Sequence, residues 1–520
     1  MDIANDPATL KTYSSDASLF EVTPNRVVRP RNVPEIIELV KSIKPSESLT
    51  ARAAGTDMSG GPLSESIVVD MMKYFNHVKG ISHMHATTEP GVYYKDFEKE
   101  TLKYGLLLPC YPASRELCAM GGIVANNSAG EKSLTYGQTV DYIEQIKMVC
   151  DDGVEHTFGP CTPDQIHDEY SRKIYTLITT HYALLQSAKP KVSKNSAGYL
   201  LWDVWDKEKN ILNVAKLITG SQGTLGIITE ATLRLVRPKQ HSTLLIIMLK
   251  DLKPLAEIVN TILKHDPESF ESYDDHTMKI ALRYLPDFIK LMGAKNIFSL
   301  AWQFLPEAWM ALTGGVPKLI LEAEFTGDSE QEIYAKARSA QADLAKFNIK
   351  TRIAKDDNEE KKYWTIRRES FNLLRHHIHG RRTAPFIDDI IVRPEYLPEF
   401  LPKLNALMDK YALIYTIAGH IGNGNFHIIP LMKMTDPKSR LIIAELSQKV
   451  YDLVFQYHGS MTAEHNDGLI RSPFLKQMYG PEVYTLFEEV KKIFDPRGIF
   501  NPGKKVGSSL PYALQHLKTL

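Results

Sequence analysis

The chain has 520 residues and equal numbers of basic and acidic residues, 62 of each, so its formal net charge is zero. Hydrophobic residues make up 43% of it, which is typical of a globular protein with two or three domains. A chain without net charge gives no support to a nucleic-acid-binding protein or to one held by acidic lipids.

The first twenty residues have neither the basic nor the apolar region of a signal peptide, and no apolar run approaches the roughly 18 residues of a membrane span. We therefore expect a cytoplasmic protein without a transmembrane segment, and peripheral association with a membrane stays open. The cysteines lack CxxC spacing, so we expect buried free thiols and neither disulfides nor an iron–sulfur cluster. These cysteines are Cys110, Cys118, Cys150 and Cys161.

Residues 22–237 alternate short strands and helices. Residues 32–43 have Asn32 in a helix-capping position, followed by apolar residues at helical spacing. The apolar run at 66–71 predicts a buried strand, and residues 146–158 predict a β-hairpin. We predict an α+β domain over 22–237.

From residue 238 to residue 460 the pattern changes to repeated β-α-β units. The apolar runs TLLIIML and KLILEAEF are each followed by a helix-forming stretch, PLAEIVNTILKHD and EQEIYAKARSAQADLAKF. This order predicts a ferredoxin-like second domain. A C-terminal segment at 461–505 carries the amphipathic helix VYTLFEEVKKIF, and residues 506–520 form a tail.

The stretch AGHIGNGNFH, residues 418–427, places two histidines seven positions apart with helix-poor glycines and asparagines between them. Apolar residues flank it on both sides, so we predict a strand, a tight turn and a second strand. If the turn folds back, His420 and His427 face each other, and converging imidazoles can hold Zn²⁺ or a similar ion. A plain hairpin with one buried and one exposed histidine is the alternative at this point, because two ligands do not make a metal site.

Three further segments are rich in glycine and other small residues, at 51–61, 120–130 and 218–235. Such residues let backbone N–H groups approach a phosphate closely, although a single loop of this kind is more often a simple turn. None matches the P-loop or the GxGxxG pattern, which disfavours a nucleoside triphosphatase and a nicotinamide-binding Rossmann domain. Three such loops in one domain favour a long ligand, and we infer a dinucleotide.

The order of the motifs along the chain resembles that of a known family. The motifs are DASLFEVTPNRVVRPRNVPEI, AAGTDMSGG, GGIVANNSAG, GSQGTLGIITEATL, GHIGNGNFH, AEHNDGLIRSPFL and FDPRGIFNPGK. The chain is similar to FAD-linked oxidases of the vanillyl-alcohol oxidase type, in the branch with D-lactate dehydrogenase, the glycolate oxidase flavin subunit and D-2-hydroxyglutarate dehydrogenase. The resemblance implies an α+β fold with a two-part FAD-binding PCMH-type domain and a ferredoxin-like FAD-linked oxidase C-terminal domain.

The resemblance also implies where FAD binds. The diphosphate is expected on the first glycine-rich loop, and the segment at 461–505 is expected to return to the flavin site. We expect non-covalent FAD, because the diphosphate loop contains no histidine for covalent attachment and Cys110 and Cys118 fall in no attachment motif. The residues that match the family's FAD-binding positions are Arg52, Gly55, Thr56, Asp57, Met58, Ser59, Gly60, Gly61, Pro112, Ser114, Gly121, Gly122, Asn127, Gly130, Gly223, Ile228 and Asn501.

Metal-containing members of this branch suggest a role for the two histidines. In those members, the residues that match His420, His427 and Glu464 bind a divalent ion, commonly Zn²⁺ or Mn²⁺. Three protein ligands leave positions open for a substrate, as a catalytic metal requires. Such an ion lowers the barrier to removing the hydroxyl proton of a 2-hydroxy acid. A solvated carboxylate is the alternative for Glu464.

The activity that the resemblance implies is FAD-dependent oxidation of a D-2-hydroxy acid of the D-lactate, glycolate or D-2-hydroxyglutarate class to the 2-oxo acid. Hydride would pass to flavin N5 while His465 accepts the hydroxyl proton, because imidazole titrates near neutrality. Arg367 matches the arginine that pairs with the substrate carboxylate, and Arg368 is the alternative. A core histidine and exposed, salt-bridged arginines are the simpler explanations.

Two positions depart from the family pattern. D-2-hydroxyglutarate members carry a lysine, which helps to hold the second carboxylate, two residues before the aspartate that matches Asp389, and this chain has Ile387 there. A dicarboxylate substrate is therefore less well supported, unless Arg381, Arg382 or a histidine of RHHIHGRR substitutes. The usual EHG is EHN at 464–466, which keeps the histidine and leaves the loop geometry open.

The sequence leaves the electron acceptor and several alternative functions open. No cluster motif follows FDPRGIFNPGK, so we expect a separate electron acceptor: an iron–sulfur protein, another electron carrier, a quinone or O₂. An alternative with the same fold is a non-redox flavin enzyme of the alkyl-dihydroxyacetonephosphate synthase kind. A flavin-free metallohydrolase using His420, His427 and Glu464 is disfavoured by the three glycine-rich loops, and a non-catalytic flavin-binding protein is disfavoured by Arg367 and His465.

Overall fold

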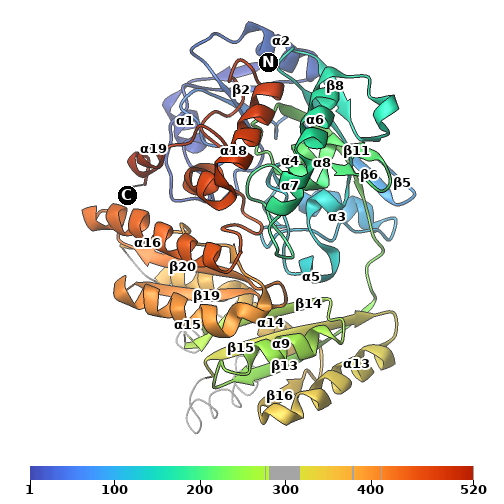
Figure 1. The fold of residues 1–520 in the computed structure, drawn as a ribbon, viewed down its shortest axis with the longest axis vertical. Helices are drawn as coiled ribbons and strands as arrows, with labels where there is room; N and C mark the ends of the chain where they lie inside the picture. Colours follow the sequence, from blue (N-terminus) through green and yellow to red (C-terminus); the bar gives the residue numbers. More distant parts are fainter. Residues whose placement is uncertain (276, 280–316, 378–379, 412, 519–520) are drawn as a thin grey trace. The chain divides into compact units, whose positions relative to one another are not determined.

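A computed structural model describes residues 1–275, 277–279, 317–377, 380–411 and 413–518 (Figure 1). The chain divides into two compact units. The first unit comprises Met1–Gly130, Tyr136–Pro238 and Ser460–Leu520, and the second comprises Glu131–Thr135 and Lys239–Gly459. No sequence pattern predicts that the five residues Glu131–Thr135 belong to the second unit.

The first unit begins with a four-stranded sheet in the order β1-β2-β4-β3. Its strands are β1 (Asp2–Ala4), β2 (Arg26–Arg29), β3 (Leu49–Arg52) and β4 (Ile67–Asp70), of which β2, β3 and β4 run parallel. Helix α2 (Val33–Ser42) packs on this sheet through Ile36 and Leu39. The side chain of Asn32 accepts a hydrogen bond from the backbone N–H of Glu35 at 3.1 Å, so the predicted cap is confirmed.

A second sheet of the first unit is antiparallel, in the order β5-β6-β12-β7-β8. Its strands are β5 (Val78–Ser82), β6 (His85–Thr88), β7 (Ile143–Val149), β8 (Glu155–Phe158) and β12 (Ile227–Arg234). Strands β7 and β8 form the hairpin that the sequence predicts. A small third sheet contains β9 (Pro160–Cys161), β10 (Trp205–Asp206) and β11 (Ile211–Asn213).

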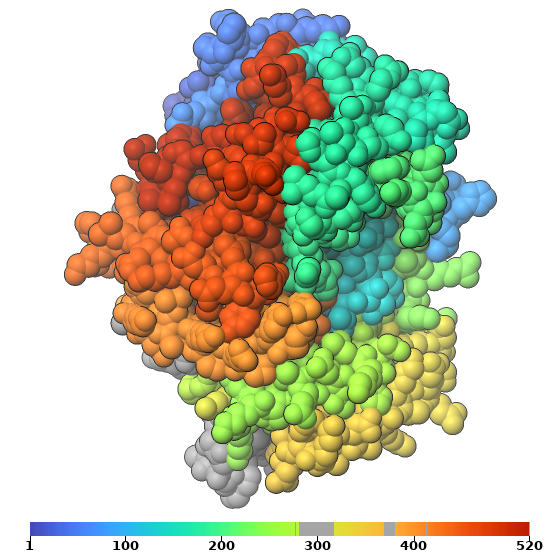
Figure 2. Space-filling model, in the orientation of Figure 1, coloured from blue at the N-terminus to red at the C-terminus, as the bar shows by residue number. Residues whose placement is uncertain are grey.

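The last residues of the chain complete both cores of the first unit. Helix α18 (Leu475–Phe494), which breaks at Gly480, packs against α6 (Glu169–Thr180) and α7 (Tyr182–Ala188), as the red and teal surfaces in Figure 2 show. Phe500 is fully buried among the residues of the parallel sheet. The remaining helices of this unit are α1 (Pro7–Tyr13), α3 (Tyr94–Leu102), α4 (Met120–Asn126), α8 (Val214–Ile218), α17 (Gly468–Arg471) and α19 (Leu510–Gln515). Helix α5 (Ser133–Tyr136) includes the point at which the chain passes from the second unit back to the first.

The second unit is built on an eight-stranded sheet in the order β16-β13-β15-β14-β19-β20-β17, with β18 paired to β20. Its first four strands follow the ferredoxin-like order and are antiparallel, so that prediction is confirmed. Helix α13 packs on β13 and β15, and α15 packs on α9 and α16. The strands are β13 (His241–Leu249), β14 (Ser269–Asp274), β15 (Leu319–Gly327), β16 (Lys350–Ile353), β17 (Arg382–Thr383), β18 (Ile390–Ile391), β19 (Ile414–His420) and β20 (Asn425–Met432). The described helices are α9 (Leu255–Leu263), α13 (Glu330–Asp343), α14 (Asp357–His377), α15 (Leu397–Met408) and α16 (Pro437–Gln456).

Two expectations about the whole chain can be compared with the structure. All four cysteines are free, as predicted, and three of them are buried, whereas Cys161 in the short strand β9 is only half-buried. Within the described ranges, no helix is both long and apolar enough to cross a membrane.

Candidate functional site

The loop that follows β3 is held in shape by its own side chains. The carboxylate of Asp57 accepts hydrogen bonds from the backbone N–H groups of Ser59, at 2.9 Å, and Gly61, at 2.6 Å. The buried guanidinium of Arg52 donates to the backbone carbonyls of Tyr13, at 3.0 Å, and Ser15, at 2.7 Å. Asp57 therefore fixes the backbone of the loop that is predicted to bind the diphosphate, whereas Arg52 ties the start of this loop to the end of α1.

Some glycines of these loops are required by the protein's own packing. A Cβ atom on Gly121 would lie 2.5 Å from the side chain of Pro90, and one on Gly130 would lie 2.2 Å from the carbonyl oxygen of Tyr111. Neither contact can relax by a side-chain movement, because a proline ring and a backbone carbonyl are rigid. The first part of the predicted second loop, Met120–Asn126, is in fact helix α4, and these two glycines allow α4 and the residues after it to approach their neighbours closely.

Two other glycines border open space. A Cβ atom on Gly122 would meet only Ala53, and one on Gly223 would meet only Ala51, each at 3.8 Å. Both alanines are at the end of β3, so small residues of all three loops meet along that strand. Small residues at these positions leave the backbone open to close approach by an extended ligand such as FAD, and the residues present therefore fit that cofactor.

The other predicted cofactor residues divide into two groups by burial. Those that are partly exposed, and so accessible to a ligand within the first unit, are Gly55, Thr56, Met58, Pro112 and Ser114. Those that are buried are Gly60, Asn127 and Ile228. Asn127 ends α4 in the left-handed conformation, with φ 52°.

Asn501 links the first loop to the third. Its side-chain Nδ2 donates to the carbonyl oxygens of Gly61, at 3.0 Å, and Gln222, at 2.7 Å. Its Oδ1 accepts a hydrogen bond from the hydroxyl of Thr50 at 3.1 Å. The C-terminal segment thus holds together two of the loops that are predicted to bind the cofactor.

The segment with Glu464 and His465 lies in the first unit and is anchored by buried charges. Glu464 forms an ion pair with Lys194, and both side chains are buried. Asp467 accepts a hydrogen bond from Nζ of Lys505 at 2.7 Å, and both of these side chains are fully buried. Burial lowers the pKa of Lys505, and the negative charge of Asp467 opposes that shift.

The two histidines of the second unit lie on the predicted hairpin. His420 ends β19 and His427 lies in β20, and the turn between them includes Gly424 with φ 74°. The two imidazole centroids are 5.3 Å apart with their planes nearly perpendicular. The prediction that the hairpin makes these histidines face each other is confirmed.

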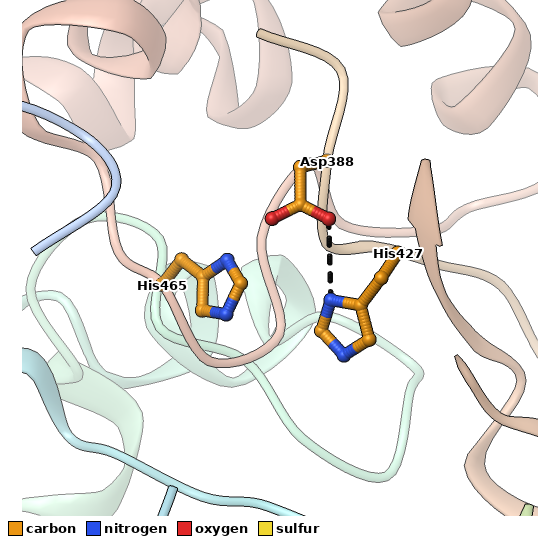
Figure 3. A group of neighbouring side chains, drawn as sticks. All are labelled: Asp388, His427 and His465. Carbon is orange, nitrogen blue, oxygen red and sulfur yellow. Dashed lines mark hydrogen bonds and ion pairs between the residues drawn. The ribbon is translucent and has the colours of Figure 1, made fainter. Parts of the chain in front are cut away.

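Each histidine contacts a fully buried carboxylate through its Nδ1 atom. Nδ1 of His420 lies 2.7 Å from Oε1 of Glu271. Nδ1 of His427 lies 3.2 Å from Oδ1 of Asp388, the contact that is drawn as a dashed line in Figure 3. An ionised carboxylate only accepts hydrogen bonds, so a carboxylate at Nδ1 favours the tautomer of a neutral imidazole in which Nδ1 carries the hydrogen and Nε2 offers its lone pair. Metal-binding histidines are commonly oriented by a carboxylate in this way.

The structure separates the two candidate arginines of α14. Arg367 is mostly buried, forms an ion pair with Glu271, and has its Nη2 3.5 Å from Nδ1 of His420. Arg368 is about half exposed, pairs with Glu131 at 2.7 Å and lies over the ring of Trp364. Of the two, Arg367 is therefore the one that shares a buried carboxylate with a candidate metal ligand.

Sequence reasoning missed the acidic residues beside these groups. Glu322 on β15 pairs in register with Glu271 on β14, and burial raises the pKa of Glu322 to about 8 against the attraction of Arg367. Burial also raises the pKa of Glu324, two residues further along β15, to about 7. The sequence feature that could have predicted them is the presence of acidic residues in otherwise apolar strands, in FESYD and LEAEF. The acidic doublet that contains Asp388 is a second such feature.

Comparison with known families gives two matches that together cover most of the chain. The family described as "FAD linked oxidases, C-terminal domain" matches residues 238–505, which is more than half of the chain. The family described as "FAD binding domain" matches residues 24–159.

Individual relatives are distant in sequence. The chain is 24% identical to a D-2-hydroxyglutarate dehydrogenase of Pseudomonas putida, over 96% of this chain and 50% of that protein. It is 24% identical to the glycolate oxidase subunit GlcD of Bacillus subtilis (95% and 91% covered) and 25% identical to a D-lactate dehydrogenase of Archaeoglobus fulgidus (95% and 96% covered). The chain thus spans about half the length of the first of these relatives.

Solved structures share the fold. An alkyldihydroxyacetonephosphate synthase superposes with a TM-score of 0.65 at 17% identity, covering 96% of this chain and 82% of that one. A substrate-bound p-cresol methylhydroxylase superposes with a TM-score of 0.67 at 14% identity, covering 97% and 93%. At these identities the likeness establishes a common architecture and carries no conclusion about the reaction.

Proposed function

Because the chain belongs to the FAD-linked oxidase family, we propose that it oxidises a D-2-hydroxy acid to the corresponding 2-oxo acid. When bound, FAD supplies the oxidant, since its N5 atom accepts a hydride from the substrate carbon. The names of distant relatives that cover nearly all of this chain support a hydroxy-acid substrate. The electrons then leave through a separate acceptor, such as an iron–sulfur protein, another electron carrier or a quinone.

The observation that carries this proposal is the pair of carboxylate–imidazole contacts in the second unit. Glu271 and Asp388 each hold the Nδ1 side of one histidine, which presents the opposite nitrogen of His420 and His427 as a ligand atom. We assign these two histidines, with Glu464 of the first unit, to a divalent ion such as Zn²⁺ or Mn²⁺. Such an ion acts as a Lewis acid on the substrate hydroxyl.

Two further side chains complete the proposed chemistry. His465 accepts the hydroxyl proton, since a neutral imidazole is the side-chain base best matched to neutral pH. Arg367 binds the substrate carboxylate through its planar guanidinium. Its existing ion pair with Glu271 holds the guanidinium next to His420, so the substrate carboxylate would join a preformed arrangement.

The charges around Arg367 favour a monocarboxylic substrate such as D-lactate or glycolate. Glu271 and Asp388 are both fully buried beside the two histidines, and Arg367 already neutralises Glu271. A second substrate carboxylate near these groups would be repelled. The position at which D-2-hydroxyglutarate members are expected to carry a lysine is Ile387, which is also fully buried.

Anaerobic titration of the purified, FAD-loaded and metal-replete protein tests the proposal. The flavin absorbance is recorded during addition of D-lactate, glycolate and D-2-hydroxyglutarate, with the L-isomers as controls. Bleaching by one D-acid or by glycolate is the expected result, with the monocarboxylates more effective than D-2-hydroxyglutarate. A protein that binds FAD and is bleached by none of these acids would contradict it and favour a non-redox flavin enzyme, and failure to bind FAD would favour a flavin-free metallohydrolase.

A further inference from the structure

Asn466, next to His465, occupies a backbone conformation that most side chains avoid. Its φ is 66°, and its side chain is fully buried. Glycine adopts this left-handed region freely, and asparagine is among the few other residues that tolerate it. The backbone geometry that glycine would give is therefore retained here, and the asparagine adds a side-chain amide that glycine lacks.

Both polar atoms of this side-chain amide, Nδ2 and Oδ1, form hydrogen bonds. Nδ2 donates to the carbonyl oxygens of Asn126, at 3.1 Å, and Gly220, at 2.9 Å. Oδ1 accepts from the backbone N–H of Asp467, at 2.7 Å, and from Nζ of Lys505, at 2.5 Å. A buried amide with these partners is held in one orientation, because losing any bond would leave a buried polar group unsatisfied.

The acceptors of this amide are in the loops that are predicted to bind FAD. Asn126 is the last residue of α4, in the second glycine-rich segment, at 120–130, and Gly220 is in the third, at 218–235. The residues that follow Asn466 add bonds to the same region, since the N–H of Gly468 donates to Oε1 of Gln222 at 2.9 Å. The N–H of Leu469 donates to the carbonyl of Ser59, in the first loop, at 2.8 Å. All of these residues belong to the first unit.

We propose that Asn466 is a positioning residue that couples the cofactor-binding loops to His465, so that bound FAD and a correctly oriented His465 stabilise each other. The coupling rests on the function proposed above for His465 and FAD. The two carbonyls that accept from Nδ2 are fixed by the loops, and FAD bound against those loops would restrict their movement. When these two carbonyls move less, the Asn466 side chain that donates to them moves less as well. His465 is the residue before Asn466, so its backbone is restrained in turn.

The experiment compares the parent protein with Asn466→Gly and with Asn210→Gly. The first variant keeps the left-handed backbone and removes the amide, so it adds no strain. The second is a matched control, because Asn210 also has a positive φ, of 53°, and is exposed elsewhere in the first unit. Hydrogen–deuterium exchange of residues 463–469 is measured with and without FAD, well below the melting temperature, together with the FAD dissociation constant and the anaerobic rate of flavin reduction.

In the parent and in Asn210→Gly, we expect FAD to slow exchange of residues 463–469. In Asn466→Gly this FAD-dependent protection should be lost, FAD should bind on the order of tenfold more weakly, and the limiting rate of flavin reduction should fall while the substrate dissociation constant changes less. Undiminished protection by FAD in Asn466→Gly would overturn the proposal. So would a variant that is merely less heat-stable, with unchanged FAD affinity and reduction rate.

Two additions keep the test decisive. If Asn466→Gly does not fold, Asn466→Asp replaces it, because aspartate keeps the acceptor for Lys505 and removes both donors to the loops, and the same loss of protection is expected. If no hydroxy acid reduces the flavin of the parent protein, the proposed reaction fails, whereas the exchange and FAD-affinity measurements still decide whether Asn466 couples the two sites.

Discussion

The Nδ1 atom of His420 lies 2.7 Å from the carboxylate of Glu271, and the same carboxylate forms an ion pair with Arg367. One fully buried side chain of β14 therefore contacts both a proposed metal ligand and the proposed substrate anchor. Because Glu271 is held between two donors, it can fix the orientation of both, and its removal should affect metal binding and substrate binding together.

Glu271→Gln should lower metal affinity about 10- to 100-fold, because a neutral amide orients the imidazole of His420 less well and makes its ring less basic. Metal content after dialysis against a graded chelator series measures this. Glu324→Gln is the matched control, since Glu324 is a partly buried glutamate on the neighbouring strand β15, where it pairs in register with Ser269. Equal metal retention in the two variants would exclude Glu271 from the metal site.

His465→Asn should leave FAD bound and metal content unchanged, while slowing substrate reduction of the flavin by about 10²- to 10⁴-fold, the usual contribution of a general base. Stopped-flow reduction under anaerobic conditions measures the rate, and the flavin absorbance of the purified variant confirms loading. A reduction rate within a factor of two of the parent would remove His465 from the chemistry.

Glu322→Gln should make the stability of the protein less dependent on pH. Because the pKa of Glu322 is raised from 4.5 to about 8 in the fold, the folded state keeps a proton that the unfolded chain releases. The free energy of unfolding therefore falls through this window as pH rises, by on the order of 1 kcal/mol per pH unit. Urea denaturation at pH 5 and pH 8 should show the variant gaining stability over the parent at the higher pH, whereas exposed Glu257→Gln should not.

Gly122→Ala and Gly130→Ala should fail in different ways. A methyl group on Gly122 has room inside the protein and replaces a helical glycine, so Gly122→Ala should fold at least as well as the parent and bind FAD more weakly. A methyl group on Gly130 would overlap the carbonyl of Tyr111, so Gly130→Ala should lower the melting temperature. Melting curves of the FAD-free proteins, followed by FAD titration, distinguish the two, and unchanged FAD affinity in Gly122→Ala would place the cofactor elsewhere.

Lys505→Met should destabilise the first unit by about 3 to 5 kcal/mol, because it leaves Asp467 buried without its cation. The double variant Lys505→Met with Asp467→Asn should recover part of that loss, since the uncompensated charge is then gone. Urea midpoints of the parent, both single variants and the double variant give the coupling energy. Strict additivity of the two single changes would show that the ion pair contributes nothing.

Local patterns in the sequence predict the elements of this fold well where the signal is short-range. The hairpin of His420 and His427 follows from glycine and asparagine between two β-branched runs, and the cap at Asn32 follows from one residue type before a helical period. The ferredoxin-like order was also accessible, because alternating strand and helix patterns leave few topologies.

The contacts around the candidate site depend on pairings that no local pattern contains. Strand β14 lies beside β19, which pairs Ser272 with Gly419 across nearly 150 positions of sequence and brings Glu271 to His420. The glycines illustrate the same limit. The sequence assigns Gly121, Gly122 and Gly130 to cofactor binding, whereas the structure shows that Gly121 and Gly130 are required by packing and that Gly122 borders open space. Only the folded environment shows whether a missing side chain leaves room for a ligand or for the chain itself.

The division of the first unit into separate chain segments has a consequence for how the protein is made. Residues 460–520 supply Phe500 to the core that β2, β3 and β4 begin, so this core stays incomplete until the whole second unit has left the ribosome. At typical speeds of translation, synthesis of the segment Lys239–Gly459 takes between about 10 and 45 s. During that interval the nascent first unit exposes apolar surface, which makes this stage of translation the one at which chaperone binding, or aggregation in its absence, should be greatest.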